Sequence, residues 1–132
     1  MPRSVSRVDS FRHALRGWAL VLRTQRNAWI HAGVSLLVIG VGLWLRLSTR
    51  DWAALLLAIG LVWMAEFLNT ALEAVVDLAS PDAHPLARAG KDIGAAAVLI
   101  AVLTAAGVGG VILGPPLWLR LGLGRFLGLG GP

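Results

Sequence analysis

Residues 55–79 read LLLAIGLVWMAEFLNTALEAVVDLA, an apolar run that polar side chains enter at helical spacing. The polar residues are Glu66, Asn69, Thr70, Glu73 and Asp77. At roughly 100° per residue they fall within an arc of about 100° and cover about 16 Å of helix axis. One face of a helix therefore carries three carboxylates, an amide and a hydroxyl. Ionisable groups are costly at membrane depth, so this face is a candidate functional site.

The composition is that of a small integral membrane protein. The chain has 132 residues, of which 57% are hydrophobic and 14% charged, and its mean hydropathy is +0.74. Soluble domains are typically about 25% charged. The absence of cysteine excludes disulfide and thiol chemistry. The formal charge is +5, but the arginines flank apolar stretches, so we assign them to anionic lipid and topology and expect no nucleic-acid partner.

The N-terminal segment predicts a helix that lies in the membrane interface. Its apolar residues follow a spacing of three and four, and arginines occupy an adjoining face; the apolar set is Val8, Phe11, Leu15, Trp18 and Leu22. The alternative is a cytosolic amphipathic helix packed on its own protein. The stretch before Gln25 has no uninterrupted apolar segment with a cleavage site, so we expect no signal peptide.

Three apolar stretches are long enough to cross a hydrocarbon core of about 30 Å. We expect membrane spans at about 28–47, 52–79 and 94–113. Prolines at 81 and 85 break the second span, and Pro115 and Pro116 follow the third. The predicted fold class is an all-α integral membrane protein with three transmembrane helices and an N-terminal amphipathic interfacial helix.

The predicted organisation has three parts. Residues 1–27 form the surface helix, and residues 28–114 form the domain of three spans. Residues 115–132 form a tail that is interfacial or disordered. We find no internal repeat.

The basic residues predict the orientation in the membrane. Eight lie in the N-terminal segment and the second loop, and four lie on the opposite side of the spans. This asymmetry predicts a multi-pass protein of the cell inner (plasma) membrane with its N-terminus in the cytoplasm. Counted from Trp52 at the outer interface, Glu66 lies about 21 Å deep and Glu73 about 31 Å deep. The polar face thus runs from the inner leaflet into cytoplasmic water.

A second polar group precedes the third expected span. Lys91 is the only lysine, and with Asp92 it stands where a helix start favours anions. A lysine suits a polyphosphate there, and the carboxylate suits Mg²⁺. The alternative is an ordinary cytoplasmic lysine beside an N-capping aspartate. His84 is a candidate nucleotide contact, whereas His13 and His31 have weaker cases.

The carboxylates of the polar face leave other interpretations open. They are also compatible with a structural network that joins subunits, or with a proton or ion pathway. Carboxylates one or two turns apart at the water boundary fit Mg²⁺ better, because phosphate supplies its remaining ligands. The sequence contains no Walker-type phosphate loop, HExxH or GxSxG motif.

The string EFLNTALEAVVD at 66–77, followed by HPLA at 84–87 and KDIGAAAV at 91–98, closely resembles the small prokaryotic diacylglycerol kinase and undecaprenol kinase family. The similarity covers roughly residues 10–115. It implies a lipid kinase that uses ATP and Mg²⁺ to phosphorylate the hydroxyl of undecaprenol or diacylglycerol, in phospholipid or cell-envelope lipid recycling. It also implies a homotrimer whose active sites are shared between neighbouring subunits.

The resemblance carries roles onto single residues. It implies that Glu66 is the general base at the lipid hydroxyl, that Asn69 supports it, and that Glu73 is a metal ligand. It places the nucleotide near four further residues: Asp77, His84, Lys91 and Asp92.

One position departs from the family pattern. Where the family has a second metal-coordinating glutamate, in a stretch like TERN, residues 24–27 read TQRN. Either Gln25 is a weaker ligand through its amide oxygen, or Asp77, Asp92 and phosphate oxygens compensate. Residues 24–31 and 112–115 resemble the undecaprenol kinase branch more than the diacylglycerol kinase branch.

The competing hypothesis is a non-catalytic membrane assembly or an ion-conducting oligomer with a polar seam. Such a seam has no need of the phosphate-binding pair Lys91 and Asp92. We further expect that, in a lone subunit, the polar face that carries Glu66 is exposed to lipid. A neighbouring subunit would then have to cover it.

Overall fold

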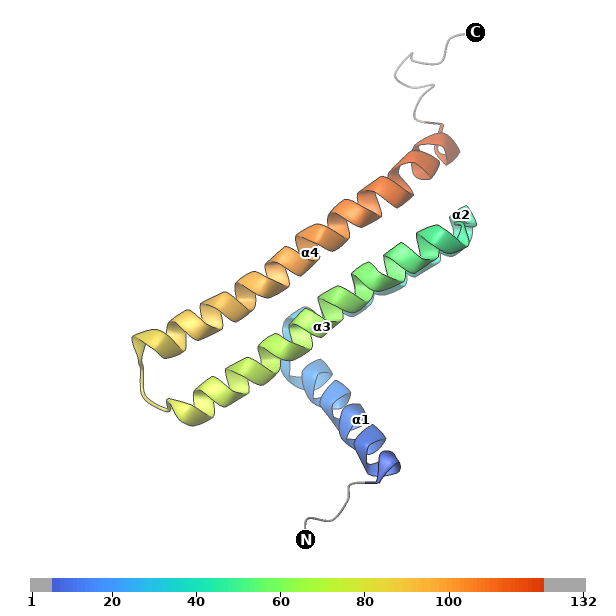
Figure 1. Cartoon of the computed structure of the whole chain (residues 1–132). Coiled ribbons are helices and arrows are strands. Elements are labelled where there is room, and N and C mark those ends of the chain that lie inside the picture. The colour runs from blue at the N-terminus through green and yellow to red at the C-terminus, as the bar shows by residue number, and fades with distance from the viewer. Residues whose placement is uncertain (1–5, 123–132) are drawn as a thin grey trace.

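The computed structural model describes residues 6–122, which form four helices and no strand (Figure 1). The helices are α1 (Arg7–Thr24), α2 (Arg26–Leu45), α3 (Thr49–Ala79) and α4 (Pro85–Arg120). α2, α3 and α4 run alongside one another as a long body, and α1 projects from it. The expected all-α class is confirmed for these residues. Residues 1–5 and 123–132, which include most of the expected tail, lie outside the described part.

The joint between α1 and the body is made by aromatic residues. The ring of Trp18 lies 4.8 Å from that of Trp63 and 4.7 Å from that of Phe67, centroid to centroid. The indole of Trp29 also donates a hydrogen bond of 2.9 Å to the carbonyl of Leu22. α1 is therefore anchored near its C-terminal half, while Phe11 on its outer part is 66% exposed. Its location in the membrane interface stays a prediction.

A tight turn reverses the chain between α2 and α3. Arg46 ends α2 in the left-handed conformation, with φ of 55°. Ser48 and Asp51 start α3 with a capping box, in which each side chain accepts from the backbone N–H of the other. Gly42 lets the chain pack closely beside this turn, because a Cβ there would lie 3.0 Å from the ring of Trp52, which would have to shift.

α4 begins at Pro85 and not at Gly94, which corrects the expected start of the third helix. Proline is favoured at the first helical position because its missing N–H needs no partner there. Lys91 and Asp92 consequently lie inside the helix, and His84, not Asp92, is its N-cap residue.

α4 also continues through Pro115 and Pro116 to Arg120, where we expected the helix to have ended. Each proline removes one backbone hydrogen bond, and these two fall in the last turns, where few further bonds depend on them. Transmembrane helices tolerate proline when neighbouring groups satisfy the freed carbonyls. The first residues of the expected tail are therefore helical.

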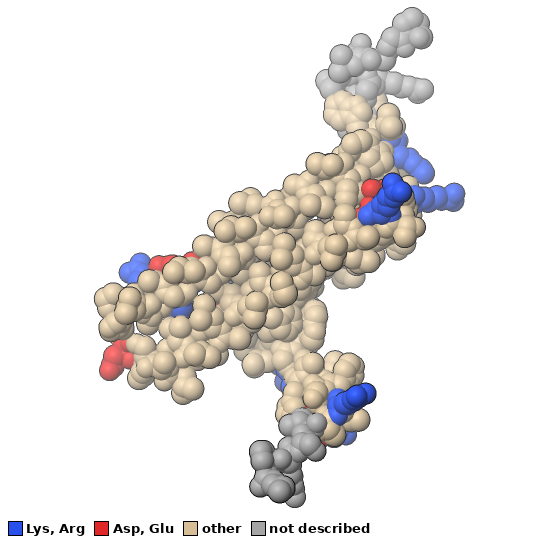
Figure 2. Space-filling view, in the orientation of Figure 1, with Lys and Arg blue, Asp and Glu red and all other residues tan. Residues whose placement is uncertain are grey.

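Most of the apolar surface of the single chain has no cover. The core at the turn end of the body consists of Leu45, Leu55 and Leu113. Elsewhere large side chains are exposed, for example Leu57 at 75% and Leu78 at 86%. Figure 2 shows that the surface along the body carries no charged side chain over most of its length, whereas charged side chains lie towards its ends and on α1. α2, α3 and α4 are each long and apolar enough to cross a membrane, so the chain is a membrane protein.

Candidate active site

The polar face of α3 becomes more exposed towards the end of the helix. Glu66 is 2% exposed, Asn69 and Glu73 are half-buried, and Asp77 is exposed. The buried end lies in the middle of the body, and the exposed end lies beside the loop to α4. A gradient of this kind leads from an apolar interior to water.

Glu66 faces α2. Its Oε2 lies 3.6 Å from Nε2 of His31, and the two side chains are 3% and 13% exposed. Nε2 of His31 is buried and has no hydrogen-bond partner in residues 6–122. This burial corrects our expectation that a lone subunit leaves Glu66 towards lipid, because the chain's own α2 already covers the carboxylate.

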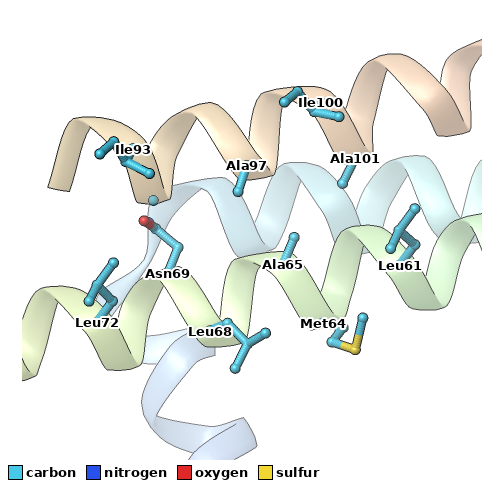
Figure 3. Close-up of a pocket in the computed structure, with 11 residues that line it drawn as sticks. Leu61, Met64, Ala65, Leu68, Asn69, Leu72, Ile93, Ala97, Ile100 and Ala101 are labelled. Atoms are coloured by element: carbon cyan, nitrogen blue, oxygen red, sulfur yellow. The ribbon is translucent and has the colours of Figure 1, made fainter. Parts of the chain in front are cut away.

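Asn69 points from α3 towards α4 (Figure 3). Its Nδ2 donates a hydrogen bond of 3.1 Å to Oε1 of Glu73, one helical turn further on. Its Oδ1 is buried without a partner in residues 6–122. Asn69 is also the one polar residue lining an otherwise apolar cavity of about 420 Å³ between α3 and α4. An unpaired acceptor in such surroundings is costly unless a ligand or subunit supplies a donor.

Gly94 permits this close approach of α3 and α4. A Cβ at position 94 would collide with Oδ1 of Asn69 and lie 3.1 Å from Cδ2 of Leu72. We predict that Gly94→Ala destabilises the protein by about 1–3 kcal/mol through overpacking, measured as a lower thermal midpoint in one detergent. Gly107→Ala is the matched control, since a Cβ at 107 meets nothing within 4 Å. Equal midpoints for the two variants would contradict the assigned contact.

An ion pair between Lys91 and Asp77 joins α4 to α3 at the loop end of the body. The lysine side chain is 38% exposed and the aspartate 64%. A second pair joins Arg88 Nε to Asp92 Oδ2 at 4.0 Å, but both side chains are largely exposed, so it adds little stability. These four residues line a polar cavity of about 730 Å³ together with the loop.

His84 has a structural contact in the same cavity. Its Nδ1 accepts a hydrogen bond of 3.2 Å from the N–H of Leu86 and so caps α4. Three other expected nucleotide contacts line the cavity with it: Asp77, Lys91 and Asp92. The first residues of α4 line the same cavity, and Lys91 follows them further along the helix, so the lysine does not itself stand at the helix start.

The two residues expected to bind metal come from different elements, Glu73 from α3 and Gln25 from the joint of α1 and α2. Glu73 is half-buried, its carboxylate is oriented by Asn69, and no ion pair in residues 6–122 includes it. Gln25 forms the extended joint between α1 and α2, and its side chain does not cap α2. Within residues 6–122, no three His, Asp or Glu side chains gather to hold a metal ion. Mg²⁺ needs no such cage when one or two carboxylates act with substrate phosphates, so Glu73 fits that mode.

Sequence reasoning gave His31 too little weight. His31 is the one ionisable residue in the interior of an expected span that also lies against Glu66. The signal was present, because an ionisable side chain within a membrane helix normally has a partner. The identity of that partner depends on how α2 and α3 are aligned, which the local pattern does not specify.

Comparison with known proteins gives a consistent result. The family model described as prokaryotic diacylglycerol kinase matches residues 12–113. A diacylglycerol kinase of Synechocystis sp. is 45% identical over 109 residues, which are 82% of this chain and 62% of that relative. An undecaprenol kinase of Bacillus subtilis is 40% identical over 108 residues, which are 82% of this chain and 88% of that relative. A diacylglycerol kinase of Escherichia coli is 39% identical over 87 residues.

The match by the family model includes both motifs, since residues 12–113 contain the polar face of α3 and the Lys91 pair of α4. The chain spans somewhat less than two thirds of the Synechocystis relative and most of the Bacillus relative. The resemblance inferred from the motifs is thereby confirmed, and the chain belongs to the prokaryotic diacylglycerol kinase family.

Proposed function

We propose that this protein is a lipid kinase that transfers the γ-phosphate of ATP to the hydroxyl of a membrane lipid, with Mg²⁺. The lipid is undecaprenol or diacylglycerol, the two substrates in the names of its relatives. The reaction serves phospholipid or cell-envelope lipid recycling at the cytoplasmic side of the inner (plasma) membrane.

The observation that carries this proposal is the order of polar groups along α3. A buried carboxylate at Glu66 is followed by the Asn69 to Glu73 hydrogen bond, and then by the Lys91 to Asp77 ion pair beside the polar cavity. A lipid hydroxyl fits the buried, apolar end of this series at Glu66. A nucleotide fits the solvent-exposed end at Lys91 and Asp77. The γ-phosphate then lies between them, near Glu73.

In the proposed reaction, Glu66 accepts the proton of the lipid hydroxyl. The hydroxyl oxygen forms a bond to the γ-phosphorus, the bond from that phosphorus to the β,γ-bridging oxygen breaks, and ADP leaves. Phosphoryl transfer depends mostly on positioning and charge neutralisation. Since Glu66 faces His31 of α2, the proposed reaction brings the hydroxyl to the contact of α2 and α3, where Trp63 also lies.

The remaining residues hold the nucleotide. Lys91 neutralises phosphate charge. To do so, its ammonium group leaves the ion pair with Asp77 and binds the phosphate instead. Asp92, Asp77 and His84 line the cavity for the rest of the nucleotide. Glu73 would hold Mg²⁺, with Gln25 as a neutral second ligand, and the cation would neutralise β- and γ-phosphate oxygens.

The lipid can be identified in one assay. The purified protein in mixed micelles is given Mg²⁺, ATP labelled at the γ-phosphate, and both lipids in parallel. We expect label in undecaprenol, because residues 24–31 and 112–115 resemble that branch. Label in diacylglycerol alone would reverse this assignment.

We predict that the protein is a homotrimer. Glu66 is covered within one chain, but Asn69 Oδ1 lacks a partner and large leucines remain exposed along the body. A neighbouring subunit would supply a donor to this acceptor. The leucines carry no comparable cost, since lipid tails are as apolar as leucine, but they give a neighbouring helix a surface to pack on. Light scattering of the detergent-solubilised protein should give three chains per particle. A strictly monomeric protein with full activity would be incompatible with this assembly.

A further inference from the structure

The side chains of His31 and Glu66 face one another across the contact of α2 and α3, and within residues 6–122 neither has another polar side-chain partner. Nε2 of His31 is buried and unpaired in residues 6–122, and it lies 3.6 Å from Oε2 of Glu66. A typical N–H···O hydrogen bond is about 2.9 Å, so a small rotation of either side chain joins them. Both groups are costly to bury singly, and pairing lowers the cost of each.

Other contacts fix the position of His31. Oγ of Ser35 donates a hydrogen bond of 2.7 Å to the carbonyl of His31, and Nε1 of Trp63 donates to Oγ of Ser35 at 3.2 Å. The imidazole also lies edge-on to the ring of Trp63, with centroids 6.3 Å apart. These contacts between α2 and α3 keep His31 next to Glu66 along the helix axes.

No other charged group in the described residues competes for Glu66. α4 has no ionisable residue between Asp92 and Arg120, and α3 has none between Asp51 and Glu66. The next carboxylate of α3, Glu73, accepts from Asn69. The arginines of α1 are exposed, and no recorded ion pair joins one of them to Glu66. His31 is thus the ionisable side chain that interacts with the carboxylate of Glu66 in the described residues.

We propose that His31 is a positioning residue for Glu66. Its Nε2–H donates to one carboxylate oxygen, which leaves the other oxygen aimed at the lipid hydroxyl whose proton it accepts. This inference rests on the proposed function, because it assigns His31 a task in that reaction. Without such a donor no hydrogen bond fixes the orientation of the carboxylate, and misplacement of a catalytic group by about 1 Å can cost about 100-fold in rate.

Two substitutions at position 31 test the donor. His31→Ala should lower kcat about tenfold to 100-fold while the KM for ATP stays unchanged, because the nucleotide cavity is elsewhere. His31→Gln keeps an N–H donor and should recover most of the loss. His13→Ala, on the exposed face of α1, is the matched control and should resemble the parent. Equal losses in the alanine and glutamine variants would overturn the proposal.

A double-mutant cycle tests whether His31 acts through Glu66. Once Glu66→Gln has removed the base, His31→Ala should cost nothing further in kcat, since residues that act as a unit are not additive. If His31→Ala costs the same factor with Glu66 present and absent, the proposal is wrong.

A measurement without turnover separates this proposal from the proposed function. In protein labelled with ¹⁵N at its three histidines, Glu66→Gln should shift the imidazole resonances of His31 and leave those of His13 and His84 in place. Unshifted His31 resonances would overturn the pairing. A parent protein with coupled resonances but no phosphate transfer to lipid would instead refute the kinase function and retain the pair.

Discussion

Glu66→Gln is expected to lower kcat by about 10²- to 10⁴-fold, with little change in the apparent KM for ATP. The amide keeps the shape of the side chain, which is 2% exposed, but it accepts no proton from the lipid hydroxyl. The measurement is initial rate against ATP concentration at saturating lipid, with thermal midpoints to establish that the variant is folded.

A matched control for this substitution lies on α1. Asp9→Asn also replaces a carboxylate with an amide, at the first turn of α1 and far along the chain from the polar face. It should keep the turnover of the parent. If Glu66→Gln retained near-parental turnover, Glu66 would not be the base, and its contact with His31 would be structural only.

Glu73→Gln is expected to abolish nearly all activity at any accessible Mg²⁺ concentration. Glu73 is the half-buried carboxylate beside Asn69, and in this account it is the charged ligand of the metal. Its amide removes one negative charge from a site that already has a neutral residue at position 25. Activity that returns to the parental level at high Mg²⁺ would argue against Glu73 as an essential ligand.

The reverse substitution at the other ligand position should strengthen the site. Gln25→Glu adds a negative charge and should lower the Mg²⁺ concentration for half-maximal activity. Gln25→Ala is the companion variant and should raise it. A titration that neither variant changes would remove Gln25 from the site, because a direct ligand cannot be silent to both changes.

The polar face of α3 could be predicted from the sequence, because it depends only on the spacing of residues within one helix. The period of 3.6 residues alone assigns Glu66, Asn69 and Glu73 to one side of a helix. The partners of that face are not local. That Lys91 pairs with Asp77, that Gly94 accommodates Asn69 and that His31 meets Glu66 all depend on the alignment of one helix with another. Side-chain spacing within a helix does not specify that alignment.

The ends of α4 were misjudged for a different reason. The sequence carries prolines at 85, 115 and 116, and we took each as a break. Proline at the first helical position starts a helix, and His84 before it supplies the capping acceptor. The two prolines near the end of α4 interrupt hydrogen bonds without ending the helix. Position within the helix, and not the residue type, decides the effect of proline.

The most direct test of the kinase assignment is the destination of the γ-phosphate. Parent protein, Glu66→Gln and Glu73→Gln are incubated in the same micelles with lipid, Mg²⁺ and ATP labelled at the γ-phosphate, and the extracted lipid is counted. The account predicts lipid-bound label with the parent, which depends on added lipid and Mg²⁺ and which both variants lose. Label that remains in ATP, or that appears only as inorganic phosphate whether or not lipid is present, would contradict it.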